Sequence, residues 1–164
     1  MTNDNCSSSC CGQSKSKINE ENKLPCPICD KISQMPVELY TVTRLVKRDL
    51  RQQVGEDNFH LCTNEECKIA YYNTQLYFNI EQLKVPIWFK TGADPKYACY
   101  CNRVTFDQVA EFKKSETFAE ISSKSNCDIL GSITGRKVNT CKERNPTGNC
   151  CCEQSFGEAI EQTS

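Results

Sequence analysis

The apolar positions of the first half of the chain form short patterns that predict strands and one helix. Residues 37–42 alternate like a half-buried strand. After it, Thr43 can cap a helix that runs through about Val54 with its apolar residues on one face. Three further strands are predicted, at residues 58–62, 68–72 and 75–80. The first half of the chain is therefore predicted to form a small unit of strands and one helix, with a hairpin turn at Asn73.

The second half is dominated by helical patterns. Three helices are predicted, over residues 106–114, 117–124 and about 151–160. Thr105 is a suitable N-cap for the first of them, and residues 125–140, which are polar and contain glycines, predict a loop. Residues 84–98 predict a linker whose apolar stretch 87–89 docks the two halves. These helices are too short to be stable alone, so packing around a bound group must hold them.

The first 24 residues carry almost no apolar side chains, which predicts a disordered tail. The tail contains Cys6, Cys10 and Cys11. These thiols form either a flexible hook for Cu(I), which soft sulfur ligands select, or an incidental set. No signal peptide is visible, and no apolar run approaches the roughly 20 residues of a membrane span. We therefore expect a cytoplasmic protein that is not membrane-embedded.

The unusual feature of the composition is its high cysteine content. The chain has 164 residues, of which 14 are cysteine and one is histidine. Lysine plus arginine (20) nearly cancels aspartate plus glutamate (21), which gives no charge footprint for nucleic acid. A secreted disulfide framework is the alternative reading of so many cysteines. Without an export signal, close cysteine pairs in a reducing compartment indicate metal ligands instead.

Two of these pairs predict a zinc site. Cys26 and Cys29 form a C-x2-C turn, and Cys62 and Cys67 form a C-x4-C turn some 30 residues later. Four thiolates complete the tetrahedron of a structural zinc site and leave no open position for catalysis. A thioredoxin-like redox pair would need a strand before Cys26, where a polar tail stands. His60 could replace a cysteine, but its place in an alternating strand favours a packed side chain.

A second cysteine set predicts an iron–sulfur cluster. Cys99 and Cys101 are too close to bridge each other without strain. Downstream lie Cys141 and the consecutive cysteines 150–152. Four thiolates drawn from two such groups are what a [2Fe–2S] cluster needs. Of the adjacent pair we favour Cys151 over Cys150, because backbone amides at the start of the last predicted helix would stabilise its thiolate.

These motifs, in this order, resemble the N-terminal region of CopZ-type copper chaperones. The resembling segments are Cys26-Pro27-x-Cys29, Cys62-x4-Cys67, Cys99-Tyr100-Cys101-Asn102-Arg103, and Cys141 before Asn145-Pro146-Thr147-Gly148-x-Cys150-Cys151. The resemblance implies zinc in a first module, and in a second a [2Fe–2S] cluster held as in bacterioferritin-associated ferredoxin. By motif, zinc falls to Cys26, Cys29, Cys62 and Cys67, and the cluster to Cys99, Cys101, Cys141 and one of Cys150 or Cys151.

One departure from the family concerns copper carriage. The family's copper-carrying domain has a Met-x-Cys-x-x-Cys loop, and neither Met1 nor Met35 precedes such a loop. We therefore expect this chain not to be a complete copper chaperone of the usual kind.

The sequence as a whole predicts an α+β protein with three parts. These are a disordered tail (1–24), a zinc-bound strand and helix module (25–90) and a small helical [2Fe–2S] module (91–164). The resemblance implies one-electron transfer that supports copper handling, with Cu(I) as a transient ligand. Its partners would be a separate copper carrier or a copper-export ATPase, and a redox partner. No acid–base or nucleophilic set is evident, so no enzymatic activity is expected. The alternatives are a ferredoxin-like carrier for an unrelated reductase and a non-redox interaction module stabilised by metals.

Overall fold

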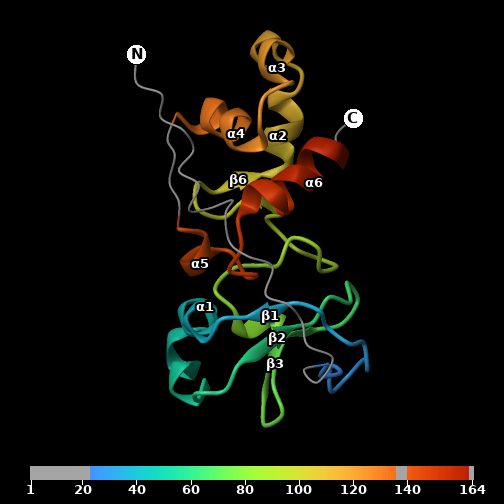
Figure 1. Cartoon of the computed structure of the whole chain (residues 1–164), viewed down its shortest axis with the longest axis vertical. Coiled ribbons are helices and arrows are strands. Elements are labelled where there is room, and N and C mark those ends of the chain that lie inside the picture. Colours follow the sequence, from blue (N-terminus) through green and yellow to red (C-terminus); the bar gives the residue numbers. More distant parts are fainter. Residues whose placement is uncertain (1–22, 136–139, 163–164) are drawn as a thin grey trace.

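The computed structural model describes residues 23–135 and 140–162. The predicted disordered tail, apart from its last two residues, lies outside the described residues, and so do Cys6, Cys10 and Cys11. The described chain has a sheet-containing half and a helical half, joined end to end (Figure 1). None of the described helices is long and apolar enough to cross a bilayer.

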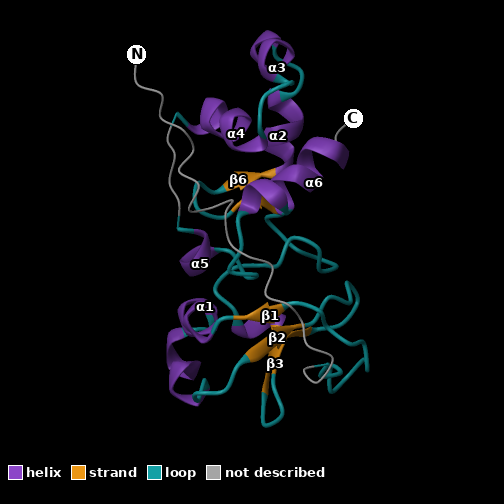
Figure 2. Cartoon of the chain, viewed as in Figure 1, coloured by secondary structure: helices purple, strands orange, loops and turns teal. Residues whose placement is uncertain are grey.

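The first half is built on a four-stranded antiparallel sheet in the order β1-β2-β3-β4 (Figure 2). Its strands are β1 (Pro36–Val37), β2 (Phe59–Leu61), β3 (Ile69–Tyr72) and β4 (Tyr77–Asn79). Three helical segments accompany it, namely α1 (Leu39–Leu45) and the 3-10 helices η2 (Arg48–Gln53) and η3 (Ile80–Gln82). The Asn73 side chain accepts hydrogen bonds from the backbone N–H groups of Gln75 and Leu76, which closes the β3–β4 hairpin.

The second half is a short hairpin covered by helices. The hairpin consists of β5 (Tyr97–Cys99) and β6 (Val104–Thr105). The helices are α2 (Phe106–Phe112), α3 (Glu116–Ile121), α4 (Asn126–Thr134), α5 (Cys141–Arg144), the 3-10 helix η4 (Cys151–Glu153) and α6 (Ser155–Gln162). Thr105 caps α2 in a reciprocal pair of hydrogen bonds with Gln108, as the sequence predicted.

Four sequence predictions of local structure are wrong. Residues 39–42 lie in α1 rather than in a strand, because Thr41, Val42 and Leu45 are buried together and this spacing requires a helix. The helix predicted from Thr43 to about Val54 is interrupted after Leu45, and the chain continues in the separate 3-10 helix η2. Residues 126–134 form α4 rather than a loop: Ser125 caps it, and its buried residues include Ile129 and Leu130. The last helix begins at Ser155, because the chain first makes the separate turn η4.

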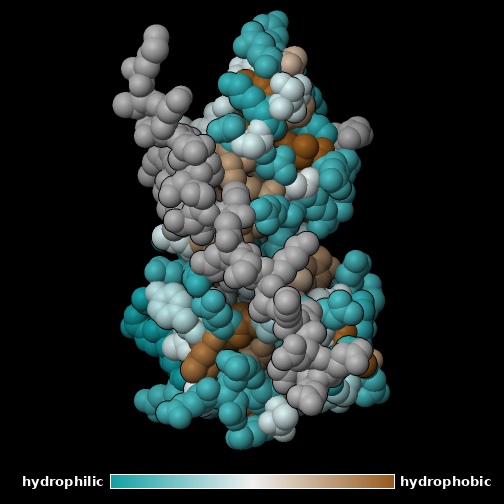
Figure 3. All heavy atoms as spheres, in the orientation of Figure 1, coloured by the Kyte–Doolittle hydropathy of each residue, from teal (hydrophilic) through white to brown (hydrophobic). Residues whose placement is uncertain are grey.

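The core runs continuously through both halves. Buried residues of the sheet half, such as Phe59 and Phe78, belong to the same hydrophobic cluster as Val109 and Phe156 of the helical half. A smaller cluster surrounds Cys26, Cys62 and Cys67. On the face drawn in Figure 3, hydrophilic residues cover most of the described surface of both halves. The halves therefore share one interior, although their metal-binding candidates are separate.

Side-chain hydrogen bonds connect the sheet half to the helical half. The Tyr71 hydroxyl, fully buried on β3, donates to the Pro146 carbonyl oxygen over 2.6 Å. The Trp88 Nε1–H donates to Glu158 of α6 over 2.7 Å, so the apolar stretch at residues 87–89 contacts the helical half as expected. The Thr41 Oγ1–H of α1 donates to the Lys142 carbonyl of α5.

We expect Tyr71→Phe to lower the free energy of unfolding by about 1–2 kcal/mol, because it leaves the buried Pro146 carbonyl without its donor. The matched control is Tyr77→Phe, at a ring that is 49% exposed, which should stay within about 0.5 kcal/mol of the parent. Urea unfolding at equal metal content measures both. Equal midpoints for the two variants would show that the bond between the halves contributes little.

Candidate metal centres

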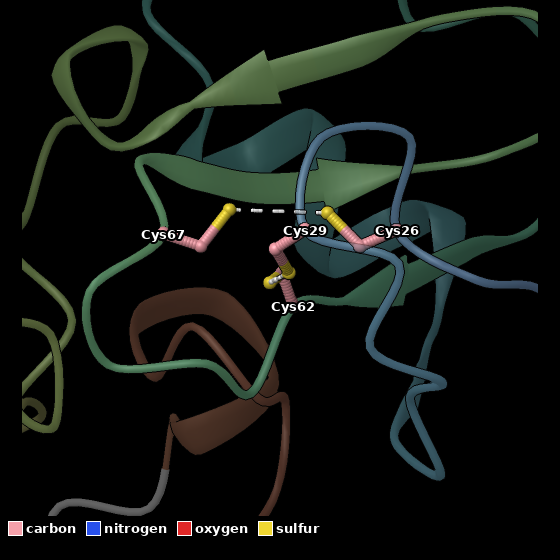
Figure 4. A group of neighbouring side chains, drawn as sticks. All are labelled: Cys26, Cys29, Cys62 and Cys67. Atoms are coloured by element: carbon pink, nitrogen blue, oxygen red, sulfur yellow. Dashed lines mark hydrogen bonds between the residues drawn. The ribbon is translucent and has the colours of Figure 1, made fainter.

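Four cysteines from two turns converge where the chain passes from β2 to β3. Their Sγ atoms lie within 4.8 Å of one another: Cys26, Cys29, Cys62 and Cys67. Figure 4 shows the four side chains pointing at a common centre, with sulfur separations of 3.9 Å (Cys26 to Cys67) and 3.7 Å (Cys29 to Cys62). A tetrahedral zinc ion with bonds of about 2.3 Å requires sulfur separations of about 3.8 Å. The donor set and its spacing therefore fit zinc.

The backbone around these cysteines is arranged to stabilise thiolates. The N–H groups of Lys31, Asn64 and Ile69 each hydrogen-bond the sulfur of the cysteine two residues before them. The first of these bonds follows a left-handed residue, Asp30, with φ 57°. Such N–H···S bonds satisfy amides that the tight turn cannot pair with carbonyls.

The pKa values of two of these thiols diverge. Burial alone would raise the pKa of Cys29, but hydrogen bonds from the Lys31 backbone and the Asn64 side chain bring it down to about 7. Burial raises the pKa of Cys62 to about 12. One sulfur of the group is therefore easily ionised, while another needs the charge of a bound cation to lose its proton.

Lys90 lies beside this group, in the segment predicted as a linker, where no sequence pattern pointed to it. Its side chain is 4% exposed. Its Nζ donates to the carbonyl oxygens of Asn64 (2.7 Å) and Cys67 (2.9 Å), both in the second cysteine turn. Burial lowers the pKa of Lys90, while the nearby thiolates of Cys62 and Cys67 raise it. A buried cation here holds the turn and offsets the negative charge of the thiolates.

A second group lies where the two halves meet. The Sγ atoms of Cys101, Cys141 and Cys151 are within 4.8 Å of one another, and all three residues are buried. Cys101 Sγ is 3.4 Å from Cys141 Sγ, and Cys141 Sγ is 4.0 Å from Cys151 Sγ. Cys99, which is 2% exposed, interacts with the sulfurs of Cys101 and Cys151. The structure thus brings together four of the five cysteines proposed for a cluster.

Two asparagine amides donate to sulfur in this second group. Asn102 Nδ2 donates to Cys99 Sγ, and Asn145 Nδ2 to Cys151 Sγ, each over 3.4 Å. Asn145 is fully buried, and its Oδ1 accepts from the N–H and the hydroxyl of Thr147. Hydrogen bonds from the sulfurs of Cys141 and Cys151 hold the pKa of Cys101 well below its usual range. A buried thiolate with several donors around it is suited to a soft cation.

A third group was missed by the sequence analysis. Cys127, Cys150 and Cys152 have their Sγ atoms within 4.8 Å of one another. Cys150 therefore lies with this group rather than in the grouping of Cys101, Cys141 and Cys151, although it also interacts with Cys141. Cys127 lies where the sequence predicts a loop, whereas the structure has helix α4 there. In the sequence, only Cys150 and Cys152, which flank Cys151 in the three-cysteine run, pointed to this group.

His60 belongs to none of the three groups. It lies on β2, where its ring stacks on Tyr72 with centroids 5.8 Å apart. Burial lowers the pKa of His60, which favours the neutral ring. The expectation of a packed histidine agrees with this position.

Comparisons with known proteins point to one family. Residues 23–84 match a CopZ family described as a zinc binding domain. The copper chaperone CopZ of Archaeoglobus fulgidus is 33% identical over 128 residues, which make up 78% of this chain and 58% of that protein. The X-ray structure of the Archaeoglobus fulgidus CopZ N-terminal domain is also 33% identical, with a TM-score of 0.60. That alignment covers 78% of this chain and 92% of the solved chain. This chain thus spans a little over half of the full-length relative.

Loss of one cysteine from the first group should cost both zinc and the sheet. We expect Cys29→Ser and Cys62→Ser to bind no stoichiometric zinc, because each lacks one of the four ligands. The sheet should then unfold, since structural zinc contributes on the order of 10 kcal/mol to the folding of such small units. Elemental analysis and circular dichroism measure zinc content and strand content. Full strand signal in a zinc-free variant would contradict the assignment.

Replacing the buried lysine tests the support around the first group. Lys90→Met keeps most of the length of the unbranched side chain but removes its two hydrogen bonds and its charge. We expect zinc affinity to fall roughly 10- to 100-fold, as for other groups that orient metal ligands. Competition with a zinc chelator measures it, and Lys31→Met, at an exposed lysine that reaches the Thr63 carbonyl at 3.4 Å, is the control. Equal affinities in the two variants would leave Lys90 with a packing role only.

Proposed function

Because this chain belongs to the family of CopZ N-terminal domains, we propose that it supports the handling of copper by supplying single electrons. In this proposal the zinc-binding domain is structural, and the second cysteine group is the redox site. The product of electron transfer is Cu(I), destined for a separate copper carrier or a copper-export ATPase. The observation that carries the proposal is the convergence of Cys99, Cys101, Cys141 and Cys151 at the meeting point of the two halves.

The residues of this group fit a [2Fe–2S] cluster. The donor set is four cysteines, the usual complement for such a cluster. When bound, the cluster supplies a centre that accepts and releases one electron. The cysteines come from β5, the turn after it, α5 and η4, so the two strands of a hairpin and two helical turns would enclose the bound group.

The chain's own residues would tune and protect this centre. The amides of Asn102 and Asn145 donate to the sulfurs of Cys99 and Cys151, and such bonds stabilise the more negative, reduced state. Tyr100, 4% exposed, interacts with Cys151, and its hydroxyl accepts a hydrogen bond from the Trp88 backbone N–H. Limited contact with water protects iron–sulfur bonds from hydrolysis and keeps electrostatic interactions strong.

A second candidate is a mononuclear, non-redox metal site. Sulfur separations of 3.4 and 4.0 Å around Cys141 are also close to the edges of a single tetrahedral site. In that case both four-cysteine groups would be structural, and the protein would act as a metal-stabilised interaction module. The two candidates differ in colour and in redox behaviour, so one preparation separates them.

The test is purification without oxygen, followed by metal analysis, visible absorption and a one-electron titration. The proposal expects two iron atoms and one zinc per chain and a visible band that bleaches on addition of one electron. Adding one equivalent of Cu²⁺ to the reduced protein should restore the band, since each Cu²⁺ takes one electron and becomes Cu⁺. A colourless protein with two zinc ions would establish the second candidate instead. Reoxidation by other acceptors but not by Cu²⁺ would indicate a general electron carrier.

Single substitutions distinguish the two adjacent cysteines of the run. After anaerobic reconstitution we expect Cys151→Ser to lose most of the cluster absorption and Cys150→Ser to keep it, because Cys151 is the one grouped with Cys101 and Cys141. Visible absorption and iron content are the measurements. The reverse pattern would move the fourth ligand to Cys150.

A further inference from the structure

The third cysteine group is compact and buried, and neither the zinc-binding domain nor the proposed cluster uses it. Cys127, Cys150 and Cys152 are 9%, 6% and 8% exposed. Their Sγ atoms lie within 4.8 Å of one another. Three thiols gathered at this distance are a ready ligand set for a soft cation.

The backbone of residues 150–152 separates this group from its neighbour. Cys150 is extended, with φ −65° and ψ 126°, and the turn η4 follows it directly. Cys151 and Cys152 lie in this 3-10 turn, where successive side chains point roughly 120° apart. Cys151 accordingly joins Cys101 and Cys141, whereas Cys150 and Cys152 both join Cys127. The two groups are adjacent but share no sulfur.

Helix α4 presents the third sulfur from the opposite side. Its nine residues begin at Asn126, with Ser125 capping the Asp128 N–H, and Cys127 is the second residue of its first turn. The Asn126 Nδ2–H donates to the Cys152 carbonyl oxygen over 2.9 Å, which fixes α4 against η4. A Cβ on Gly157 of α6 would come within 3.3 Å of both partners of this bond, so glycine there permits the close approach.

The first turn of α4 also favours a charged sulfur at Cys127. The unpaired amides of a helix N-terminus and the helix dipole stabilise a thiolate. The helix N-terminus only adds to the stability of the thiolate; the binding site itself consists of the three converging sulfurs.

The third group offers three sulfur ligands, and this number determines which metal it suits. Structural zinc is held by four protein ligands, and this group consists of three cysteines, with no histidine or carboxylate of the described residues joining it. Cu(I) is satisfied by two or three thiolates and prefers sulfur. A trigonal metal with bonds of about 2.3 Å places its sulfurs about 4.0 Å apart, within the spacing found. We propose that Cys127, Cys150 and Cys152 form a three-thiolate binding site for Cu(I).

This site extends the function proposed above without depending on it. If the neighbouring group supplies electrons, Cu(I) would be held next to the place where it is produced. If that group is structural, the third site still binds Cu(I) by itself. Metal content and visible absorption report on the neighbouring group separately from copper binding, so the two proposals can fail independently.

The test uses the full chain with Cys6, Cys10 and Cys11 changed to serine, which removes the thiols of the tail as competitors. The anaerobic protein is titrated with Cu(I) against a chromophoric Cu(I) chelator. Cys127→Ser and Cys152→Ser each remove one sulfur, from α4 and from η4, and Ser132→Ala, at an exposed position of α4, is the control. Zinc content, iron content and visible absorption are recorded for every variant to show that the fold and the other two groups persist.

We expect the parent and the Ser132→Ala control to bind one tightly held Cu(I) with no loss of iron or zinc. Each cysteine variant should bind it at least roughly 100-fold more weakly, since loss of a ligand must exceed the loss caused by a supporting residue. X-ray absorption should show three sulfur neighbours. Unchanged affinity in both cysteine variants would overturn the proposal. So would copper uptake that displaces iron from the neighbouring group, or a second zinc ion that Cys127→Ser removes.

Discussion

Mutual repulsion between converging thiolates is the constraint on which the rest of this structure depends. Two unit charges 4 Å apart repel by about 4 kcal/mol at an effective dielectric constant of 20. The eleven described cysteines are all thiols, and ten of them gather in the three groups within 4.8 Å. Ionised together they would push the loops apart, whereas a cation at each centre reverses the sign of the interaction. The backbone N–H groups at the first centre, the buried Lys90 and the amides at the second each reduce the same repulsion.

The features that the sequence predicts correctly are those that depend on residues close together in the chain. The spacing of Cys26 from Cys29 and of Cys62 from Cys67 fixes which sulfurs can share an ion, so this group was found in full. The strands β2 to β4 and the cap of α2 also depend on near neighbours. The six residues 37–42 fit a strand and one face of a helix equally well, and only packing decides between them. Lys90 and Cys127 gain their roles from segments distant in sequence, which no local pattern reveals.

The shared core gives the two halves a common stability. Tyr71 on the sheet reaches Pro146 in the loop that carries the second group's cysteines, and Thr41 of α1 lies against the same loop. A Cβ on Gly148, whose φ is 71°, would approach Thr41 Oγ1 to 2.8 Å. The loop between Cys141 and Cys151 is therefore shaped by the sheet half. A metal bound at either cysteine group would stabilise contacts that the other needs, so metal affinities at the two groups would be thermodynamically linked.

The sorting of Cys150, Cys151 and Cys152 between two groups has a consequence for how this loop can vary among relatives. Cys150 is extended, and the 3-10 turn η4 begins at the next residue, so the directions of the three sulfurs depend on where that turn starts. Insertion or loss of a residue within the run would move the start of the turn and redirect sulfurs from one group to the other. Where all three cysteines are present in a relative, the spacing within the run should therefore vary less than the length of the loop before it.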